Sequence, residues 1–463
     1  MNRLSDAPAA PSGRLRRIDL ATASPQELGG LARRQTVPDR RVREGAAQIL
    51  ADVRSRGDDA VRSANDRFGG GLPDGRLILA ADELARACEA LPRAVRVALD
   101  QAIEHVERFA ATQRPVASRT TTAHGIEIER RWVPLDRVGC YVPGGSAPYP
   151  SSLVMTVAPA RVAGVGSIVV ASPADASGQV DEVLLGAAGL LGVQEFVVAG
   201  GAHAVGALAY GLPGAGIAPV DKVVGPGNAW VTAAKIEVAA EVAIDLPAGP
   251  SEGMVLADAT ADPVLVAADL VTQAEHGSDS PAILVTLDGG LADAVEAEIE
   301  ALLPRLERRD ILARSLANHG AIVLAPDLER AIELVNAYAP EHLSIAVADP
   351  EPVVDRIRHA GSVFVGPWSP ESAGDYATGA NHVLPTGGLA RGCSPLAVEA
   401  FGHYVQVQRL TRDGLAQIRE TVVTLATAEG LTAHRNAIEA RFLGRAGTAA
   451  RRDLGTATRV IGR

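Results

Sequence analysis

Cysteine is scarce in this chain of 463 residues, and the three cysteines present are poorly placed for shared chemistry. Cys88, Cys140 and Cys393 are odd in number, lie far apart and include no CxxC pair. This spacing suggests neither a disulfide framework nor a zinc site made of thiolates. Any metal ion bound by this chain should therefore be held by nitrogen and oxygen ligands.

Long apolar segments and an excess of basic residues are also missing. No apolar run is long enough to cross a membrane, and the N-terminus lacks the apolar centre of a signal peptide. We therefore expect a soluble, cytoplasmic protein without a membrane partner. Lysine and arginine number 44 against 55 aspartates and glutamates, and no basic stripe is interleaved with aromatic residues. Nucleic acid is for this reason not an expected partner.

Hydrophobic residues are plentiful, at 47% of the chain, and from about residue 120 they fall into a repeating order. Short apolar runs predict strands at Gly125–Leu135, Ser167–Ala171, Glu195–Ala199, Lys222–Val224, Gly253–Ala257, Ala282–Thr286, Ala321–Ala325 and Ser362–Val365. Between them, helical patterns occupy Asp181–Leu191, His203–Tyr210, Asn228–Val242, Asp262–His276, Leu291–Glu307 and Asp327–Tyr338. This alternation predicts an α/β fold with parallel sheets covered by helices on both faces.

The chain is too long for one compact core, so more than one lobe is expected. We predict two tandem Rossmann-like parallel-sheet units, preceded by a helical N-terminal region and followed by a small helical C-terminal tail domain. The predicted boundaries are a disordered N-terminus at 1–17, the helical region at 18–119, a first α/β unit at 120–250, a second at 251–385 and the tail at 386–463.

The predicted helix Asp262–His276 carries the first candidate site residues. Asp262 can cap its start, and Gly277 can end it. Gln273 and His276 then stand three residues apart on one face of the last turn. An amide oxygen and an imidazole presented together can hold a metal ion. Two ligands are not a site, however, and the same pair fits a glutamine that caps a neighbouring strand beside a hydrogen-bonded core histidine.

Two acid-containing segments follow. Glu341 and His342 come after a helix that Pro340 must end, so we expect them on irregular backbone, addressing different parts of a site, unless they are a surface pair. The segment 371–386 follows the predicted strand Ser362–Val365, where α/β sheets carry ligand sites.

Polar groups crowd this segment. Asp375 could be an oxygen ligand to the same metal as Gln273 and His276, while Asn381 and His382 could contact a substrate.

Two glycine loops lie in the first predicted unit. Tyr141-Val142-Pro143-Gly144-Gly145-Ser146 leads into Tyr149-Pro150-Ser151-Ser152, and Val224-Gly225-Pro226-Gly227-Asn228 opens a helix. Both let backbone N–H groups approach an anion such as a pyrophosphate, although tight structural turns would look the same. Neither loop is GxGxxG, so the standard dinucleotide fingerprint is absent.

Taken in order, these blocks resemble the histidinol dehydrogenase family. The blocks are Tyr141-Val142-Pro143-Gly144-Gly145, Gly225-Pro226-Gly227-Asn228, Ala248-Gly249-Pro250-Ser251-Glu252, Gln273-Ala274-Glu275-His276, Ala339-Pro340-Glu341-His342-Leu343, the run from Gly374 to Thr386, and Ala433-His434. The resemblance covers about residues 18–442 in the family's order and spacing, and such a series is highly specific.

The resemblance implies a zinc enzyme of histidine biosynthesis that oxidises L-histidinol, through L-histidinaldehyde, to L-histidine with two NAD. Glu341 and His342 would be the catalytic acid–base pair. By the family pattern, the zinc ligands would be Gln273, His276, Asp375 and His434. Substrate would be held by Ser251, Gln273, His276, His342, Asp375, His382, Glu429 and His434. Tyr141, His203 and Asn228 fall on NAD-binding positions.

The resemblance also implies a homodimer with shared active sites. The family's C-terminal segment reaches over the neighbouring subunit, so Glu429 and His434 would act in the partner's site. Three residues depart from the family pattern: His203 stands where glutamine is usual, Ser344 where glutamate is usual, and His403 where lysine is common. None of these replaces an implied metal ligand or catalytic residue.

Three other functions fit parts of the sequence. A paralogue could keep the zinc and NAD machinery and oxidise another small polar alcohol, such as a sulfonated diol. A cysteine-based aldehyde dehydrogenase could form a thioester on Cys140 or Cys393. A protein that binds nucleotide without catalysis is the least specific alternative, and the many polar groups in loop positions argue against it.

Overall fold

The computed structural model describes residues 15–32, 34, 37–144 and 148–443. Contacts divide the chain into two compact units, Met1–Arg114 with Pro134–Gly402, and Pro115–Val133 with His403–Arg463. Of the segment 1–17, expected to be disordered, only residues 15–17 are described, and strand β1 (Arg16–Asp19) begins there. None of the helices in the described part of the chain is long and apolar enough to span a membrane.

The first sheet of the first unit has six strands in the order β2-β7-β6-β5-β8-β9. All neighbours are parallel except β2 and β7. The strands are β2 (Ile78–Leu79), β5 (Arg137–Tyr141), β6 (Ser167–Ser172), β7 (Glu195–Val198), β8 (Lys222–Val224) and β9 (Ala243–Ile244). The helices before and between them are α2 (Arg40–Arg56), α3 (Asp58–Phe68), α4 (Ala81–Ala90), α5 (Arg93–Thr112), α6 (Pro150–Ala163), α7 (Glu182–Leu190), α8 (Gly201–Tyr210) and α9 (Ala229–Val238).

The second sheet is entirely parallel, in the order β1-β12-β11-β10-β13-β14. Its further strands are β10 (Gly253–Ala257), β11 (Ala282–Thr286), β12 (Ala321–Leu324), β13 (His342–Ala346) and β14 (Ser362–Val365). Its helices are α1 (Pro25–Ala32), α10 (Pro263–Glu275), α11 (Gly289–Leu302), α12 (Arg309–His319), α13 (Leu328–Tyr338), α14 (Glu351–Val354) and α15 (Glu371–Tyr376).

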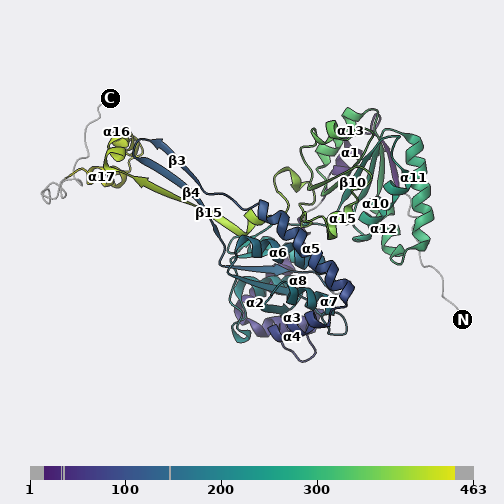
Figure 1. Ribbon diagram of the computed structural model, residues 1–463, viewed down its shortest axis with the longest axis horizontal. Coiled ribbons are helices and arrows are strands. Elements are labelled where there is room, and N and C mark those ends of the chain that lie inside the picture. The colour runs from purple at the N-terminus through teal and green to yellow at the C-terminus, as the bar shows by residue number, and fades with distance from the viewer. Residues whose placement is uncertain (1–14, 33, 35–36, 145–147, 444–463) are drawn as a thin grey trace. The chain divides into compact units, whose positions relative to one another are not determined.

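Both faces of the second sheet are buried, because side chains alternate between two cores. Met254 and Leu256 of β10 belong to the core that includes residues of α13, whereas Val255 and Ala257 belong to the core beneath α10, α11 and α12. Figure 1 shows α13 and α11 on opposite sides of this sheet. The predicted α/β class with two parallel-sheet units is confirmed.

Several predicted elements match the observed ones. The predicted strands Lys222–Val224, Gly253–Ala257, Ala282–Thr286 and Ser362–Val365 coincide with β8, β10, β11 and β14. Asp262 caps α10 as expected, because its side chain accepts a hydrogen bond of 2.9 Å from the N–H of Val264.

One backbone expectation was wrong in part. Glu341 and His342 were expected on irregular backbone, and Glu341 lies in a bend, but His342 opens strand β13 and lies opposite Gly253 of β10. Ala339 ends α13 in the left-handed region with φ of 55°, so a single reversal lets the chain re-enter the sheet at once.

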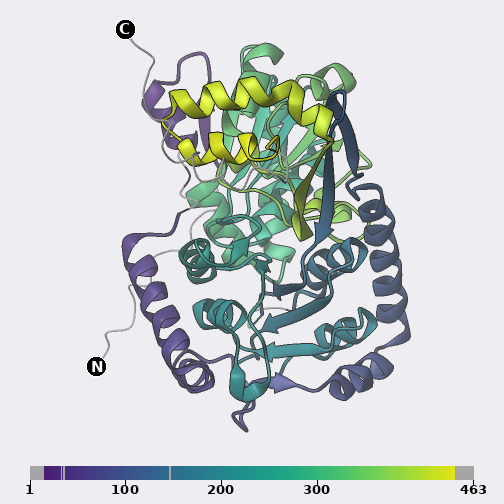
Figure 2. The same cartoon turned by 90° about the vertical axis from the view of Figure 1, so that its left-hand side faces the viewer.

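The second unit contains a three-stranded sheet in the order β15-β4-β3, together with two helices. Its elements are β3 (Ser118–Ala123), β4 (Ile126–Pro134), β15 (Gly402–Leu410), α16 (Arg412–Ala428) and α17 (Thr432–Glu439). Figure 2 shows α16 and α17 side by side at the yellow end of the chain. The tail thus carries the expected helices and also strand β15, which the sequence analysis did not identify.

Replacing Leu284 of β11 by alanine should destabilise the protein by about 2–5 kcal/mol, because its fully buried side chain would leave a cavity between β11 and the helices above it. Leu324 at the end of β12 is 37% exposed, so its replacement by alanine should cost about 0.5 kcal/mol. Denaturant unfolding of both variants measures the difference. An equal loss of unfolding free energy in both variants would contradict the assignment of Leu284 to the core and of Leu324 to the surface.

Candidate active site

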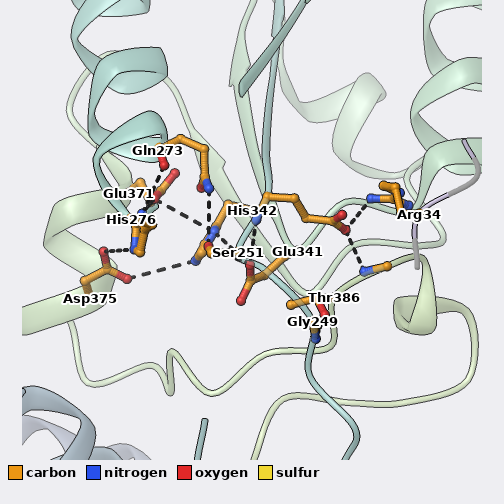
Figure 3. Close-up of polar contacts among 12 residues, drawn as sticks. Arg34, Gly249, Ser251, Gln273, His276, Glu341, His342, Glu371, Asp375 and Thr386 are labelled. Atoms are coloured by element: carbon orange, nitrogen blue, oxygen red, sulfur yellow. Dashed lines mark hydrogen bonds and ion pairs between the residues drawn. The ribbon is translucent and has the colours of Figure 1, made fainter. Parts of the chain in front are cut away.

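Within the first unit, we call the part built on the sheet β2-β7-β6-β5-β8-β9 the first lobe and the part built on the sheet β1-β12-β11-β10-β13-β14 the second lobe. Polar side chains from four segments of the second lobe converge at one place (Figure 3). Gln273 and His276 come from the end of α10, Glu371 and Asp375 from α15, and His342 from the start of β13. The loop before β10 adds Ser251, and Glu341 precedes β13. We expected the carboxyl ends of the strands to carry this site, but these residues lie at the amino ends of β10 and β13, because α10 and α15 run back along the sheet.

Three of these residues could hold a metal ion. His276, Glu371 and Asp375 each offer a ligand atom, and these atoms lie within 4.8 Å of one another. The Nδ1 atom of His276 lies 3.7 Å from Glu371 Oε1, and its Nε2 atom lies 3.9 Å from Asp375 Oδ2. Imidazole and carboxylate ligands of this kind suit zinc and related divalent ions.

Unsatisfied atoms mark the same place. Gln273 Oε1, both ring nitrogens of His342, and Glu371 Oε1 are buried without a hydrogen-bond partner. The other amide atom of Gln273 is used, since Nε2 donates to Ser251 Oγ at 3.3 Å. Buried polar atoms are normally paired, so a cluster of unpaired acceptors fits a bound cation or a polar ligand. The nitrogen and oxygen ligand atoms of Gln273, His276, Glu371 and Asp375 therefore fit the expected metal ion.

Glu341 is buried and held firmly in place. Its Oε2 accepts hydrogen bonds from Ser251 Oγ at 2.7 Å and from the N–H of Glu252 at 2.9 Å. Burial nevertheless raises the pKa of Glu341 to about 8, with the nearby charges of Glu252 and Asp375 adding to the rise. This carboxyl group can therefore exchange a proton near neutral pH.

His342 lies beside Glu341, with its Nδ1 atom 3.7 Å from Glu341 Oε2. Burial lowers the pKa of His342 to about 3, and His276 and His382 lower it further. The imidazole of His342 is therefore neutral at physiological pH and able to accept a proton. Its ring faces that of His276 at 6.1 Å between centroids.

The loop 249–252, which holds Glu341, is itself fixed by contacts with Arg34 and with residues 386 and 387 (Figure 3). Glu252 forms an ion pair with Arg34 and accepts a hydrogen bond of 3.0 Å from the N–H of Gly387. The N–H of Gly249 donates to Thr386 Oγ1 at 2.6 Å. These contacts fix residues 249–252. They therefore also fix the hydroxyl of Ser251 and the N–H of Glu252, which donate hydrogen bonds to Glu341.

His382 joins the two lobes of the first unit. Its Nδ1 atom lies 2.9 Å from the carbonyl oxygen of Asp375, which can only accept, so Nδ1 carries the proton. Its Nε2 atom is then free to accept from Ser152 Oγ of α6, at 3.2 Å. Burial lowers the pKa of His382 and raises that of Asp375. Asn381, expected to contact substrate, instead donates to the carbonyl of Met155 at 2.7 Å.

The three expected cofactor residues lie at the carboxyl-end edge of the first sheet. The hydroxyl oxygen of Tyr141 accepts a hydrogen bond of 3.3 Å from the N–H of Gly201, and burial raises its pKa to about 12. Asn228 caps α9 by accepting from the N–H groups of Trp230 and Val231. Gly145 and Ser146 of the neighbouring glycine loop lie outside the described residues.

His203 is buried on α8 and hydrogen-bonded within the fold. Its Nε2 atom lies 3.0 Å from Asn65 Oδ1. The amide nitrogen of Asn65 donates to the carbonyl of Val198, so its Oδ1 is an acceptor and Nε2 of His203 carries the proton. Burial lowers the pKa of His203 to about 4, which keeps this imidazole neutral.

Glu429 and His434 belong to the second unit, whereas all the residues gathered above belong to the first. Glu429 is the residue at the end of α16, His434 lies on α17, and both are exposed.

Two residues of the site were missed in the sequence. Glu371 lies one helical turn before Asp375, and this i, i+4 spacing of two acids was the available signal. For the segment that contains Ser152, the sequence predicted only an anion-binding glycine loop. No local pattern indicates the contact of Ser152 with His382, because the two residues are 230 positions apart.

A catalytic thiolate at Cys140 is not supported. Cys140 is fully buried in β5, and burial raises the pKa of its thiol to about 12. Because the thiolate is the nucleophilic form, this cysteine is inert at physiological pH.

Two parallel-sheet lobes, one carrying glycine loops and the other an acid–base pair beside a metal-type donor cluster, form the architecture of an oxidoreductase. The histidinol dehydrogenase family model matches residues 32–442, and the chain belongs to this family. This agrees with the resemblance found in the sequence.

Individual relatives support the assignment. The chain is 46% identical over 404 residues to histidinol dehydrogenase of Leifsonia xyli, covering 87% of this chain and 92% of the relative. It is 45% identical over 441 residues to histidinol dehydrogenase of Mycobacterium tuberculosis, covering 94% and 99%. The crystal structure of histidinol dehydrogenase from Elizabethkingia anophelis matches with a TM-score of 0.86 and 35% identity, covering 92% of this chain and 98% of that one.

Proposed function

We propose that the protein is a zinc-dependent histidinol dehydrogenase that converts L-histidinol, through L-histidinaldehyde, to L-histidine with two NAD, in the final steps of histidine biosynthesis. The observation that carries this proposal is the buried pair Glu341 and His342, set beside unpaired ligand atoms of Gln273, His342 and Glu371. Family membership supports the substrate.

Gln273, His276 and Asp375 would hold the zinc ion, with His434 from the partner copy as a fourth ligand. When bound, zinc would act as a template that orients the amine and imidazole of the substrate. The carboxylate of Glu371 lies 3.7 Å from Nδ1 of His276, where it can orient that ring. Ser251, His382 and Glu429 of the partner subunit would complete the substrate pocket.

His342 would take the hydroxyl proton of the alcohol as a hydride leaves the same carbon. Burial keeps the ring neutral, and its two ring nitrogens have no hydrogen-bond partner, so one of them is free to take this proton. When bound, NAD would supply the hydride acceptor for both oxidations. Tyr141, His203 and Asn228 would form part of its binding site, at the carboxyl-end edge of the first sheet.

Glu341 would serve the second oxidation. The aldehyde must add water before a second hydride can leave, and a carboxylate with a pKa near 8 can remove a proton from that water. Ser251 and the N–H of Glu252 hold this carboxylate through Oε2, which leaves Oε1 for the proton transfer.

The alternative paralogue, acting on a sulfonated diol or a similar alcohol, is not favoured. Relatives named histidinol dehydrogenase match nearly the whole chain at 45% identity. A homodimer remains part of the proposal because Glu429 and His434 would act across subunits.

Purified protein supplied with L-histidinol should form two NADH per molecule consumed, because the alcohol loses four electrons on the way to the acid. A chelator should abolish this turnover, and added zinc should restore it. The measurement is NADH absorbance against histidinol consumed, with a sulfonated diol as the control substrate. One NADH per histidinol, or turnover of the diol alone, would contradict the proposal.

The variant His276→Ala should lose most of its bound zinc, because it removes one imidazole from the donor cluster. His319→Ala is a matched control, since His319 is also exposed at the end of a helix in the same unit. Metal analysis of both purified variants, with circular dichroism to check folding, measures the effect. Full zinc content in His276→Ala would place the metal elsewhere.

Replacing Glu341 by glutamine should slow aldehyde oxidation by about 10²- to 10⁴-fold and spare the first hydride step. Below pH 8 the wild-type carboxyl is mostly protonated, so oxidation of added L-histidinaldehyde should rise with pH up to about 8 and then level off. The titratable groups that interact with Glu341 include Glu252, His342, Glu371 and Asp375.

The variant should lose this pH dependence, since the amide does not titrate. Single-turnover rates for the alcohol and for the aldehyde, measured from pH 6 to pH 9, separate the two steps. Equal loss of both steps would show that Glu341 has no special role in the second.

A further inference from the structure

A buried ion pair lies in the first lobe, away from the acid–base site. It joins Lys235 of α9 to Asp245, which follows β9, and their side chains are 3% and 1% exposed. Burying two charges costs free energy that their attraction often does not return, so such a pair calls for a reason beyond stability.

The two charges hold opposite sides of one backbone residue. Nζ of Lys235 donates to the carbonyl oxygen of Gly225 at 2.8 Å. The N–H of Gly225 donates to Asp245 Oδ2, also at 2.8 Å. Asp245 is itself fixed, because its Oδ1 accepts from the N–H of Leu246 at 2.7 Å. Both polar backbone groups of Gly225 are thus charge-assisted hydrogen-bond partners.

Gly225 needs this support because its backbone is unusual. Its φ is 114°, and a Cβ atom built there would lie 2.1 Å from the carbonyl oxygen of Tyr141. The loop therefore leaves β8 in a conformation open only to glycine, pressed against the end of β5. Three residues after Gly225 comes Asn228, which caps α9.

These contacts tie the loop 225–228 both to the helix that it opens and to the segment after β9. The loop 225–228 opens α9, and Lys235, two turns into α9, reaches back to the first residue of the loop. Asp245 ties the same residue to the segment after β9. The direction in which the loop leaves the sheet is thus set by two side chains that do not themselves face the acid–base site.

We propose that Lys235 and Asp245 are positioning residues for the dinucleotide, which hold the loop 225–228 and the adjoining end of β5 in the shape that NAD binds. This inference rests on the proposed NAD dependence. A loop that is ordered beforehand spares the cofactor the cost of ordering it, so loss of the pair should weaken cofactor binding and leave the chemistry largely intact.

The test uses Lys235→Met, Asp245→Asn and a control, Lys222→Met. The asparagine variant removes the charge and keeps one acceptor oxygen, so it can still accept from only one of the N–H groups of Gly225 and Leu246. Lys222 is a half-buried lysine at the amino end of β8, and like Lys235 it donates to a carbonyl, that of Ala400 at 2.7 Å. NADH binding is followed by fluorescence on full-length, chelator-treated protein, independently of turnover.

The expected result is a rise in the NADH Kd and in the NAD KM of about 10-fold or more in Lys235→Met and Asp245→Asn, with kcat and the histidinol KM within about 2-fold of wild type. Lys222→Met should keep the wild-type Kd even if its melting temperature falls. If Lys235→Met does not fold, Asp245→Asn provides the same readout.

Wild-type affinity for NADH in either folded variant would overturn the inference. An equal loss in Lys222→Met would also overturn it, since the effect would then follow general destabilisation. A wild-type protein that binds no NADH would instead refute the proposed cofactor, so failure of that proposal is distinguishable from failure of this one.

Discussion

The parallel pairing of β10 with β13 is the contact on which the site depends. Its register sets Gly253 opposite His342, and the N–H of His342 donates to the carbonyl of Glu252 at 3.2 Å. The same register brings Ser251 and Glu252 against Glu341 as hydrogen-bond donors. A Cβ atom on Gly253 would lie 2.8 Å from Gln273 Oε1, so the strand also leaves room for a ligand from α10. One strand pair therefore joins the acid–base residues to the metal-type donors.

Electrostatics at this place are unbalanced without a cation. The carboxyl groups of Glu341 and Glu371 are buried and that of Asp375 is half-buried, and the pKa of each is raised by burial. The charges of Glu341 and Asp375 each help to raise the pKa of Glu371. A divalent ion would offset this repulsion and give the unpaired atoms partners, which is a physical reason for such a cluster to be tolerated in a core.

The sequence predicted some parts of the molecule better than others, for physical reasons. Strands buried on both faces, such as β10 and β11, read as continuous apolar runs and were located exactly. Strand β13 was missed because it opens on His342 and includes Ser344, whose polar side chains hide the apolar run. Glu371 was missed because its one local signal, the i, i+4 spacing to Asp375, does not show that both carboxylates lie close to His276 in space.

The edge of the second sheet that carries the cluster was also predicted wrongly, and the observed edge bears on how the two lobes would share one active site. The first sheet presents Tyr141 and the loop after β8 at its carboxyl ends, as open α/β sheets usually do. The second presents Glu341 and His342 at its amino ends. The lobes are joined where Ser152, near the start of the helix that follows β5, contacts His382 at 3.2 Å. A carboxyl edge thus meets an amino edge, so a substrate held beside Glu341 and His342 would lie between those residues and a cofactor bound on the first sheet, as hydride transfer from substrate to cofactor requires.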